Sequence, residues 1–170
     1  MKTIFLIRHA KSSHEGFSGN DAARPLNERG KKDAPAMAQR LLDKDIAIDA
    51  FMTSPAVRAS TTARLFAEVY GIPEKDLIEV PSLYMADSAA FIAAIRNAPD
   101  GAETLAVFSH NNGITQFANS VSDARIDHMP TCSVFAVQCD ITRWQEFQGT
   151  GNRFLFFDSP KKTVRVNKFG

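Results

Sequence analysis

The chain has 170 residues, of which 44% are hydrophobic and 23% are charged. This length and composition predict one globular domain over residues 1–170, with a core large enough to fold by itself. The formal net charge of +1 excludes the strongly basic surface that binds nucleic acid or an anionic membrane. We therefore expect neither partner, and any bound anion must be held by cations gathered locally.

The start of the chain does not resemble a targeting segment. The apolar run at residues 4–7 is too short for a signal peptide before it meets Arg8, and no stretch reaches transmembrane length. Cys132 and Cys139 lie in a strand-like run that would hold them more than ~20 Å apart, beyond disulfide reach. These features predict a cytoplasmic protein with reduced cysteines.

The first part of the chain predicts a strand, a long loop and a helix. Residues 3–7 form a continuous apolar run, typical of a strand buried on both faces. Residues 10–26 are polar and rich in turn formers, and a loop of this length is often functional. Asn27 is a plausible cap for a helix that ends near Lys44, and Pro35 either kinks this helix or divides it in two.

A second strand at residues 50–53 leads into a helix. Ser54 fits the N-cap and Pro55 the first helical position, and the helix is expected to run to about Tyr70. Further along, Ser88 is expected to cap a third helix. The remaining predicted elements are strands at 77–80, 105–108, 133–139 and 154–157 and helices at 88–96 and 113–120.

The alternation of strands and helices predicts the fold class. It indicates an α/β fold, a three-layer α/β/α sandwich around a mostly parallel sheet of about six strands. The last strand has no strong helix before it and could be antiparallel at an edge. The basic tail at 161–170 alternates in polarity, which fits either a short edge strand or a frayed end.

Two of the predicted strands are followed directly by a histidine. Arg8 and His9 follow the first strand, and His110 follows the strand at 105–108. Ligands of open parallel sheets bind beyond the carboxyl ends of the strands. If these two strands are neighbours, both imidazoles lie in one crevice, and Arg58 reaches it from the first turn of the helix after the second strand.

These four side chains suit phosphoryl transfer. A neutral His9 can attack phosphorus, while Arg8 and Arg58 hold the phosphoryl oxygens and His110, if protonated, adds a donor. The nearby arginines should lower the pKa of His9 and keep it neutral. A metal site would need a third ligand, and the arginines would repel the cation, so we expect no metal.

Four segments resemble a known family. Residues 6–10 resemble the Arg-His-Gly signature of the histidine phosphatase (phosphoglycerate mutase-like) superfamily, with Ala10 in place of the glycine. Residues 54–63 match its Ser-Pro-x-x-Arg-Ala-x-x-Thr-Ala element, residues 109–113 its second histidine motif, and residues 24–30 the segment before its first helix. The short chain, with Arg-His-Ala-Lys-Ser-Ser and Arg-Pro-Leu, resembles the SixA-type branch, whose named activity is phosphohistidine phosphatase.

The resemblance implies a phosphoglycerate mutase-like fold and a specific mechanism. His9 would be the nucleophile, and Arg8, Arg58 and His110 would form the phosphate pocket, with no metal or cofactor. The implied reaction is hydrolysis of protein-borne phosphohistidine through a covalent intermediate on His9.

The sequence departs from the family pattern at the position of the proton donor. Many relatives use a glutamate after the third strand, but residues 80–88 contain none. Asp87 is the one carboxylate well placed in sequence, and we favour a role in capping the next helix with Ser88 instead. An alcohol leaving group needs a proton, whereas the nitrogen of a phosphoramidate can be protonated beforehand, so the missing acid favours phosphohistidine.

Four further residues are candidate substrate-binding groups. Ser12 and Ser13 can donate to phosphate or satisfy the loop backbone, Arg24 can steer an anion or brace the loop, and Asn111 adjoins the second histidine. Two other functions stay open. A small-molecule phosphomonoesterase or mutase of the same superfamily is disfavoured by the missing glutamate. A non-catalytic phosphate-binding module is disfavoured because it would not need a nucleophile.

Overall fold

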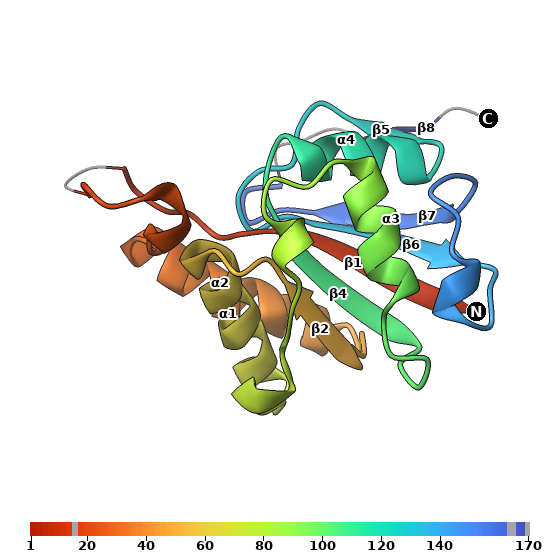
Figure 1. The fold of residues 1–170 in the computed structure, drawn as a ribbon, viewed down its shortest axis with the longest axis horizontal. Coiled ribbons are helices and arrows are strands. Elements are labelled where there is room, and N and C mark those ends of the chain that lie inside the picture. The colour runs from red at the N-terminus through yellow and green to blue at the C-terminus, as the bar shows by residue number, and fades with distance from the viewer. Residues whose placement is uncertain (15–16, 163–165, 169–170) are drawn as a thin grey trace.

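The computed structural model describes residues 1–14, 17–162 and 166–168. Its centre is a six-stranded sheet in the order β3-β2-β4-β1-β6-β7 (Figure 1). The strands are β1 (Lys2–Arg8), β2 (Ala50–Thr53), β3 (Ile78–Glu79), β4 (Thr104–Ser109), β6 (Val134–Cys139) and β7 (Arg153–Asp158). β1 to β4 run parallel to one another, whereas β6 is antiparallel to β1 and β7 to β6.

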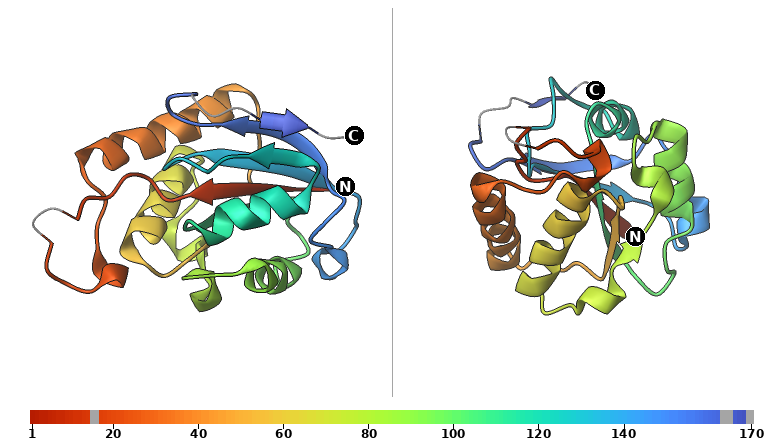
Figure 2. Two further views of the ribbon diagram at one scale, coloured as in Figure 1. Left: turned by 90° about the horizontal axis from the view of Figure 1, so that it is seen from above. Right: turned by 60° about the vertical axis from the view of Figure 1, so that its left-hand side comes forward.

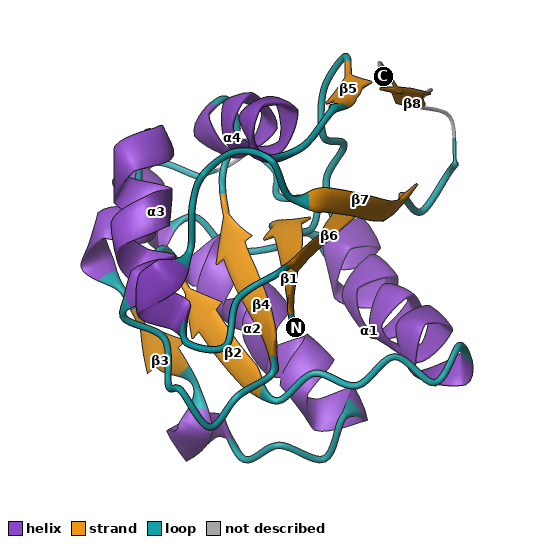
Figure 3. Cartoon of the chain, turned by 90° about the vertical axis from the view of Figure 1, so that its right-hand side faces the viewer, coloured by secondary structure: helices purple, strands orange, loops and turns teal. Residues whose placement is uncertain are grey.

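Helices cover both faces of the sheet, which confirms the three-layer sandwich. They are α1 (Glu28–Asp43), α2 (Val57–Val69), α3 (Ser88–Arg96) and α4 (Gly113–Val121). Figure 3 shows the sheet between α3 on one side and α1 on the other. Side chains of β1 alternate between the two layers, because Phe5 and Ile7 join the cluster beneath α1 and α2 while Ile4 and Leu6 join the one beneath α3 and α4.

The adjacency of β1 and β4 positions the site. The two strands pair in parallel, and their register places Arg8 opposite Ser109. The next residue of each strand is a histidine, and the His9 N–H donates to the Ser109 carbonyl at 3.1 Å. His9 and His110 therefore leave the sheet side by side at its C-terminal edge, as expected. Figure 2 shows the loop between β1 and α1 extending beyond this edge.

The start of α2 differs from the prediction. The helix begins at Val57 with Ala56 as its N-cap residue, so Ser54 is not the cap and Pro55 is not the first helical residue. The Ser54 hydroxyl accepts from the Ala56 N–H at 3.2 Å and also contacts His110. The Ser54 oxygen therefore stabilises the turn before α2 and contacts the second histidine; it does not cap the helix.

The other helix starts are closer to expectation. Asn27 caps α1 by accepting from the Gly30 N–H at 2.9 Å, and α1 is a single helix that contains Pro35. Its buried stripe continues on both sides of the proline, which favours one helix despite the lost backbone bond; the stripe comprises Ala34, Met37, Ala38 and Leu41. In α3 the cap is Asp87, which accepts from the Ala90 N–H at 2.9 Å, and the predicted cap Ser88 is the first helical residue.

The far edge of the sheet is more antiparallel than predicted. β6 is antiparallel to β1, and β7 is antiparallel to β6. The sequence suggested an antiparallel direction for the last strand alone. A separate short ribbon pairs β5 (Ala124–Ile126), which was not predicted, with β8 (Val166–Lys168) in the tail. The tail thus contains an edge strand, while residues 163–165 and 169–170 lie outside the described part.

Two further sequence features have structural counterparts. Cys132 and Cys139 are both buried and form no disulfide. Burial raises the pKa of the Cys139 thiol to about 12. Within the described residues, no helix is both long and apolar enough to span a bilayer.

Candidate active site

A pocket of about 330 Å³ lies where β1 and β4 end. It contains both predicted histidines and all three predicted arginines, together with polar residues of the neighbouring loops. Its lining residues are Arg8, His9, Lys11, Ser12, His14, Arg24, Arg58, His110, Asn111 and Thr131. Among the described residues, the lining includes three arginines and a lysine and no carboxylate.

Hydrogen bonds fix the orientation of the His9 ring. Nδ1 lies 2.7 Å from the Ala10 carbonyl, which can only accept, so Nδ1 carries the proton and Nε2 the lone pair. Ala10 is held in turn, because its N–H donates to Thr62 Oγ1 at 2.9 Å and this hydroxyl donates to the Arg58 carbonyl at 2.7 Å. The small, fully buried Ala10 fits where the family signature has glycine.

His9 is uncharged at neutral pH. His9 is buried, with only 5% of its surface exposed to solvent. Burial lowers the pKa of the imidazole to about 3; the Ala10 carbonyl opposes this shift, and the positive charges of His110, Arg8 and Arg58 add to it. A neutral imidazole with a fixed lone pair at Nε2 is a competent nucleophile.

His110 lies beside His9, with ring centroids 5.3 Å apart. Its Nε2 is 2.7 Å from Ser54 Oγ, and the edge of Tyr84 packs on the ring at a centroid distance of 5.5 Å. Burial, followed by the charge of Arg58, lowers the pKa of His110 to about 4. The second histidine is therefore also neutral in this state of the site.

Asp21, in the loop between β1 and α1, joins two of the arginines. Its Oδ2 accepts from Arg58 at 2.9 Å and from the Tyr84 hydroxyl at 2.7 Å, and its Oδ1 accepts from Arg24 at 3.2 Å. The Asp21 carbonyl also accepts from Arg58, at 2.8 Å. The Tyr84 hydrogen bond, with the bonds from Arg58 and Arg24, holds the pKa of Asp21 far below its usual range. Asp21 is ionised and has no proton to give.

Four buried side-chain nitrogens lack a hydrogen-bond partner among the described residues, and all four belong to this pocket. They are Nε of Arg8, Arg24 and Arg58 and Nδ1 of His110. Buried polar atoms are normally paired, and a guanidinium Nε can only donate. The arrangement is suited to a tetrahedral oxyanion held beside Nε2 of His9.

The predicted substrate-binding residues divide between the pocket and its surroundings. Ser12 lines the pocket and accepts a hydrogen bond from Arg24. Arg24 therefore both lines the pocket and braces the loop that carries Ser12. Asn111 also lines it and donates to the Met129 carbonyl at 3.3 Å. Ser13 is not a lining residue.

The sequence-based prediction missed several side chains that build the site. Asp21 and Tyr84 hold the arginines, and Ser54 and Thr62 hold the two histidine loops. Ser54 and Thr62 lie inside the quoted Ser-Pro-x-x-Arg-Ala-x-x-Thr-Ala element, which was a usable signal. Asp87 caps α3 and does not line the pocket, so it is not placed as a proton donor there.

A family model matches part of the chain. The model of the histidine phosphatase superfamily (branch 1) matches residues 4–83. Over that segment the chain is similar to the histidine phosphatase superfamily. The matched segment includes Arg8, His9 and Arg58, and the structure adds His110 of the same pocket from β4.

Individual relatives share this fold. An uncharacterized chloroplastic protein of Arabidopsis thaliana is 29% identical over 154 residues, which cover 85% of this chain and 70% of that protein. The protein histidine phosphatase SixA complexed with tungstate matches with a TM-score of 0.79 at 21% identity, over 94% of this chain and 97% of that one. A SixA protein of Agrobacterium tumefaciens matches with a TM-score of 0.76 at 21% identity, over 94% and 98%. These likenesses establish the histidine phosphatase fold of the chain.

The pocket presents guanidinium donors, which bind anions. Among the described residues, no group of three or more His, Cys, Asp or Glu side chains is placed to hold a metal ion.

Proposed function

We propose that the chain is a metal-independent phosphatase that hydrolyses protein-borne phosphohistidine through a phosphorylated His9. The observation that carries the proposal is a neutral histidine nucleophile among N–H donors that have no partner among the described residues, in a pocket whose described lining residues include no carboxylate. The proposal rests on the family for phosphatase chemistry and on this pocket for the substrate class.

In the first step, Nε2 of His9 attacks phosphorus. The new N–P bond forms as the N–P bond of the substrate breaks, and the electron pair goes to the leaving imidazole. The Ala10 carbonyl, 2.7 Å from Nδ1, stabilises the positive charge that His9 acquires. Arg8, Arg24 and Arg58 hold the phosphoryl oxygens and balance their charge.

In the second step, water attacks the phosphorus of phospho-His9. The bond between Nε2 and phosphorus breaks, its electron pair returns to the ring, and both protons of the water leave with inorganic phosphate or pass to solvent. His9 returns to its neutral form, which the lowered pKa favours. His110 presents its Nδ1, which has no partner among the described residues, to the phosphoryl group.

The lack of an acid favours phosphohistidine over a phosphate ester. An alkoxide leaving group needs a proton in the transition state. Asp21 is ionised and bonded to arginine, and Asp87 caps α3, so neither supplies one. The leaving imidazole of phosphohistidine can take a proton from water at its second nitrogen before the N–P bond breaks, and so leaves as a neutral group.

The similar structures support this substrate class. The SixA structure is of a protein histidine phosphatase and holds tungstate, a tetrahedral oxyanion. The three guanidinium Nε donors without a partner among the described residues are suited to the same shape of anion.

The test is hydrolysis of a phosphohistidine protein and a panel of phosphate esters in parallel, in excess chelator. We expect release of phosphate from phosphohistidine at a rate at least tenfold above that from any ester. Preference for a sugar phosphate or another small ester would replace the proposal with a general phosphomonoesterase. Absence of turnover on every substrate, with phosphate binding retained, would instead identify a binding module.

A cytoplasmic location, and the absence of nucleic-acid and membrane partners, stay predictions of the sequence. The absence of nucleic-acid and membrane partners follows from the near-zero net charge, and we include it in the proposal.

A further inference from the structure

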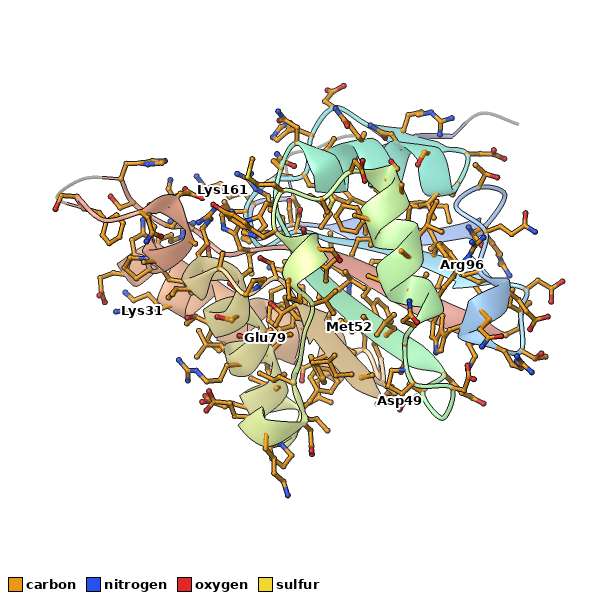
Figure 4. All side chains as sticks on the ribbon, in the orientation of Figure 1. Lys31, Asp49, Met52, Glu79, Arg96 and Lys161 are labelled. Atoms are coloured by element: carbon orange, nitrogen blue, oxygen red, sulfur yellow. The ribbon has the colours of Figure 1, made fainter. Side chains whose placement is uncertain are left out.

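A second cavity, of about 160 Å³, adjoins the phosphate pocket and shares Lys11 and Thr131 with it. We call it the side cavity. The residues that the argument uses are Lys11, Arg29, Asp33, Thr131, Pro160 and Lys161. Figure 4 labels Lys161, which lies on the same side of the molecule as the loop that follows β1.

The backbone on two walls of the side cavity is anchored. A Cβ at Gly30 would lie 2.2 Å from the Lys11 carbonyl oxygen, so only glycine permits this close approach of α1 to the loop. Arg40 binds both carboxylate oxygens of Asp158 at 3.0 Å, which fixes the end of β7 three residues before Lys161. Lys11 and Lys161 therefore extend from fixed positions.

Cations outnumber carboxylates in the side cavity. Among the described residues, Lys11, Arg29 and Lys161 line it, and Asp33 is the one acidic residue of the lining. Arg29 Nε already bonds both oxygens of Asp33, at 3.2 and 3.3 Å. In the described part of the chain, neither Lys11 nor Lys161 forms a salt bridge. Because the whole chain carries a net charge of only +1, this excess of positive charge is local.

We infer that the side cavity binds an acidic side chain of the protein substrate, close in sequence to the phosphohistidine. The inference rests on the proposed function, which places the phosphoryl group against His9. Residues on the same polypeptide then lie beside the side cavity, and their binding there is intramolecular. The ammonium groups of Lys11 and Lys161 provide point charges for a carboxylate, while Pro160 gives the wall a rigid backbone.

The exposure of Lys161 to solvent limits how much an acidic flank can raise kcat/KM. Lys161 is exposed, and an exposed ion pair contributes a modest amount that salt screens. We expect acidic flanks to raise kcat/KM by about two- to fivefold per engaged lysine at low ionic strength. The preference should fade near 1 M salt.

The test compares two phosphohistidine peptides with the full chain. In one, three glutamates flank the phosphohistidine on each side, and in the other glutamines replace them. Lys161→Met and Lys161→Glu are the test variants because Lys161 lines the side cavity but not the phosphate pocket. Lys31→Met, a change of an exposed lysine that lines neither cavity and is also labelled in Figure 4, is the control.

We expect the wild-type chain and the Lys31 variant to prefer the glutamate peptide. Lys161→Met should lower kcat/KM for that peptide about two- to fivefold and leave the glutamine peptide unchanged, and Lys161→Glu should lower it further. Equal kcat/KM for both peptides in the wild type, or an equal loss on both in the variants, would overturn the inference and leave the proposed function standing. Failure of the wild type to hydrolyse either peptide would overturn both.

Discussion

Oγ of Ser54 and Nε2 of His110 lie 2.7 Å apart, and this contact joins the end of β2 to the residue that follows β4. Ser54 is fully buried, and its oxygen also accepts from the Ala56 N–H at 3.2 Å. The bond occupies one nitrogen of His110 and leaves Nδ1, which has no partner among the described residues, for a ligand.

Replacement of Ser54 by alanine should therefore impair the site more than the fold. Ser54→Ala leaves Nε2 of His110 buried and unpaired, and we expect kcat on phosphohistidine to fall about tenfold, the effect of about 1.4 kcal/mol on the barrier. Ser120→Ala, which changes a serine of α4 outside the pocket, is the matched control. An unchanged kcat in a folded Ser54 variant would show that this contact does not position His110.

Asp21 provides the counter-charge for two arginines of the pocket. Asp21→Asn keeps the shape but leaves Arg24 and Arg58 without a carboxylate. Because Asp21 is half exposed, we expect a loss of about 1 kcal/mol, or ~2–4 °C in Tm. Phosphate should restore more of the Tm in this variant than in the wild type, since the anion replaces the lost charge.

Differential scanning calorimetry with and without phosphate measures both effects. Asp123→Asn, an exposed acid outside the pocket, controls for the change in net charge. Equal Tm values and equal phosphate shifts in the wild type and the Asp21 variant would contradict the counter-charge role.

The buried neutral histidines make stability depend on pH. The pKa of His9 is lowered to about 3 and that of His110 to about 4, from about 6.5 when unfolded. Between about pH 6.5 and pH 4 the unfolded chain binds more protons, so the free energy of unfolding falls as the pH falls. Each histidine should contribute on the order of 1 kcal/mol per pH unit in this window.

Denaturant unfolding from pH 7 to pH 4.5 tests this dependence. His110→Gln should reduce the slope of unfolding free energy against pH, because one buried titrating group is gone. His128→Gln, a change of an exposed histidine outside the pocket, is the control for the substitution itself. Identical slopes for all three proteins would contradict the lowered pKa of His110.

The sequence allowed prediction of the features that are local in the chain. Arg8, His9 and His110 lie in one pocket, as predicted, because Arg8 ends β1, the histidines follow β1 and β4, and strand ends in a parallel sheet converge. The position of Arg58 in the pocket was predicted from its place in the first turn of the helix after β2, even though that helix starts later than expected. The parallel pairing of β1 with β4 was a condition of the prediction, and the structure meets it.

Features that depend on distant contacts could not be predicted. Ser54 resembles a helix cap locally, but its partner His110 is 56 residues away. The hydrogen bond between Tyr84 and Asp21 spans 63 residues, and nothing near either residue indicates it. The antiparallel direction of β6 was missed for the same reason, because a buried strand is apolar whichever way it runs.

The central claim is that His9 is the nucleophile, and His9→Ala tests it most directly. Turnover of phosphohistidine and the affinity for inorganic phosphate would be measured in this variant, in the wild type and in His128→Ala, whose histidine is exposed and outside the pocket. We predict that His9→Ala loses about 10³-fold or more in turnover, while the arginines keep most of the phosphate affinity and the His128 variant matches the wild type. Turnover that survives in His9→Ala would contradict the account.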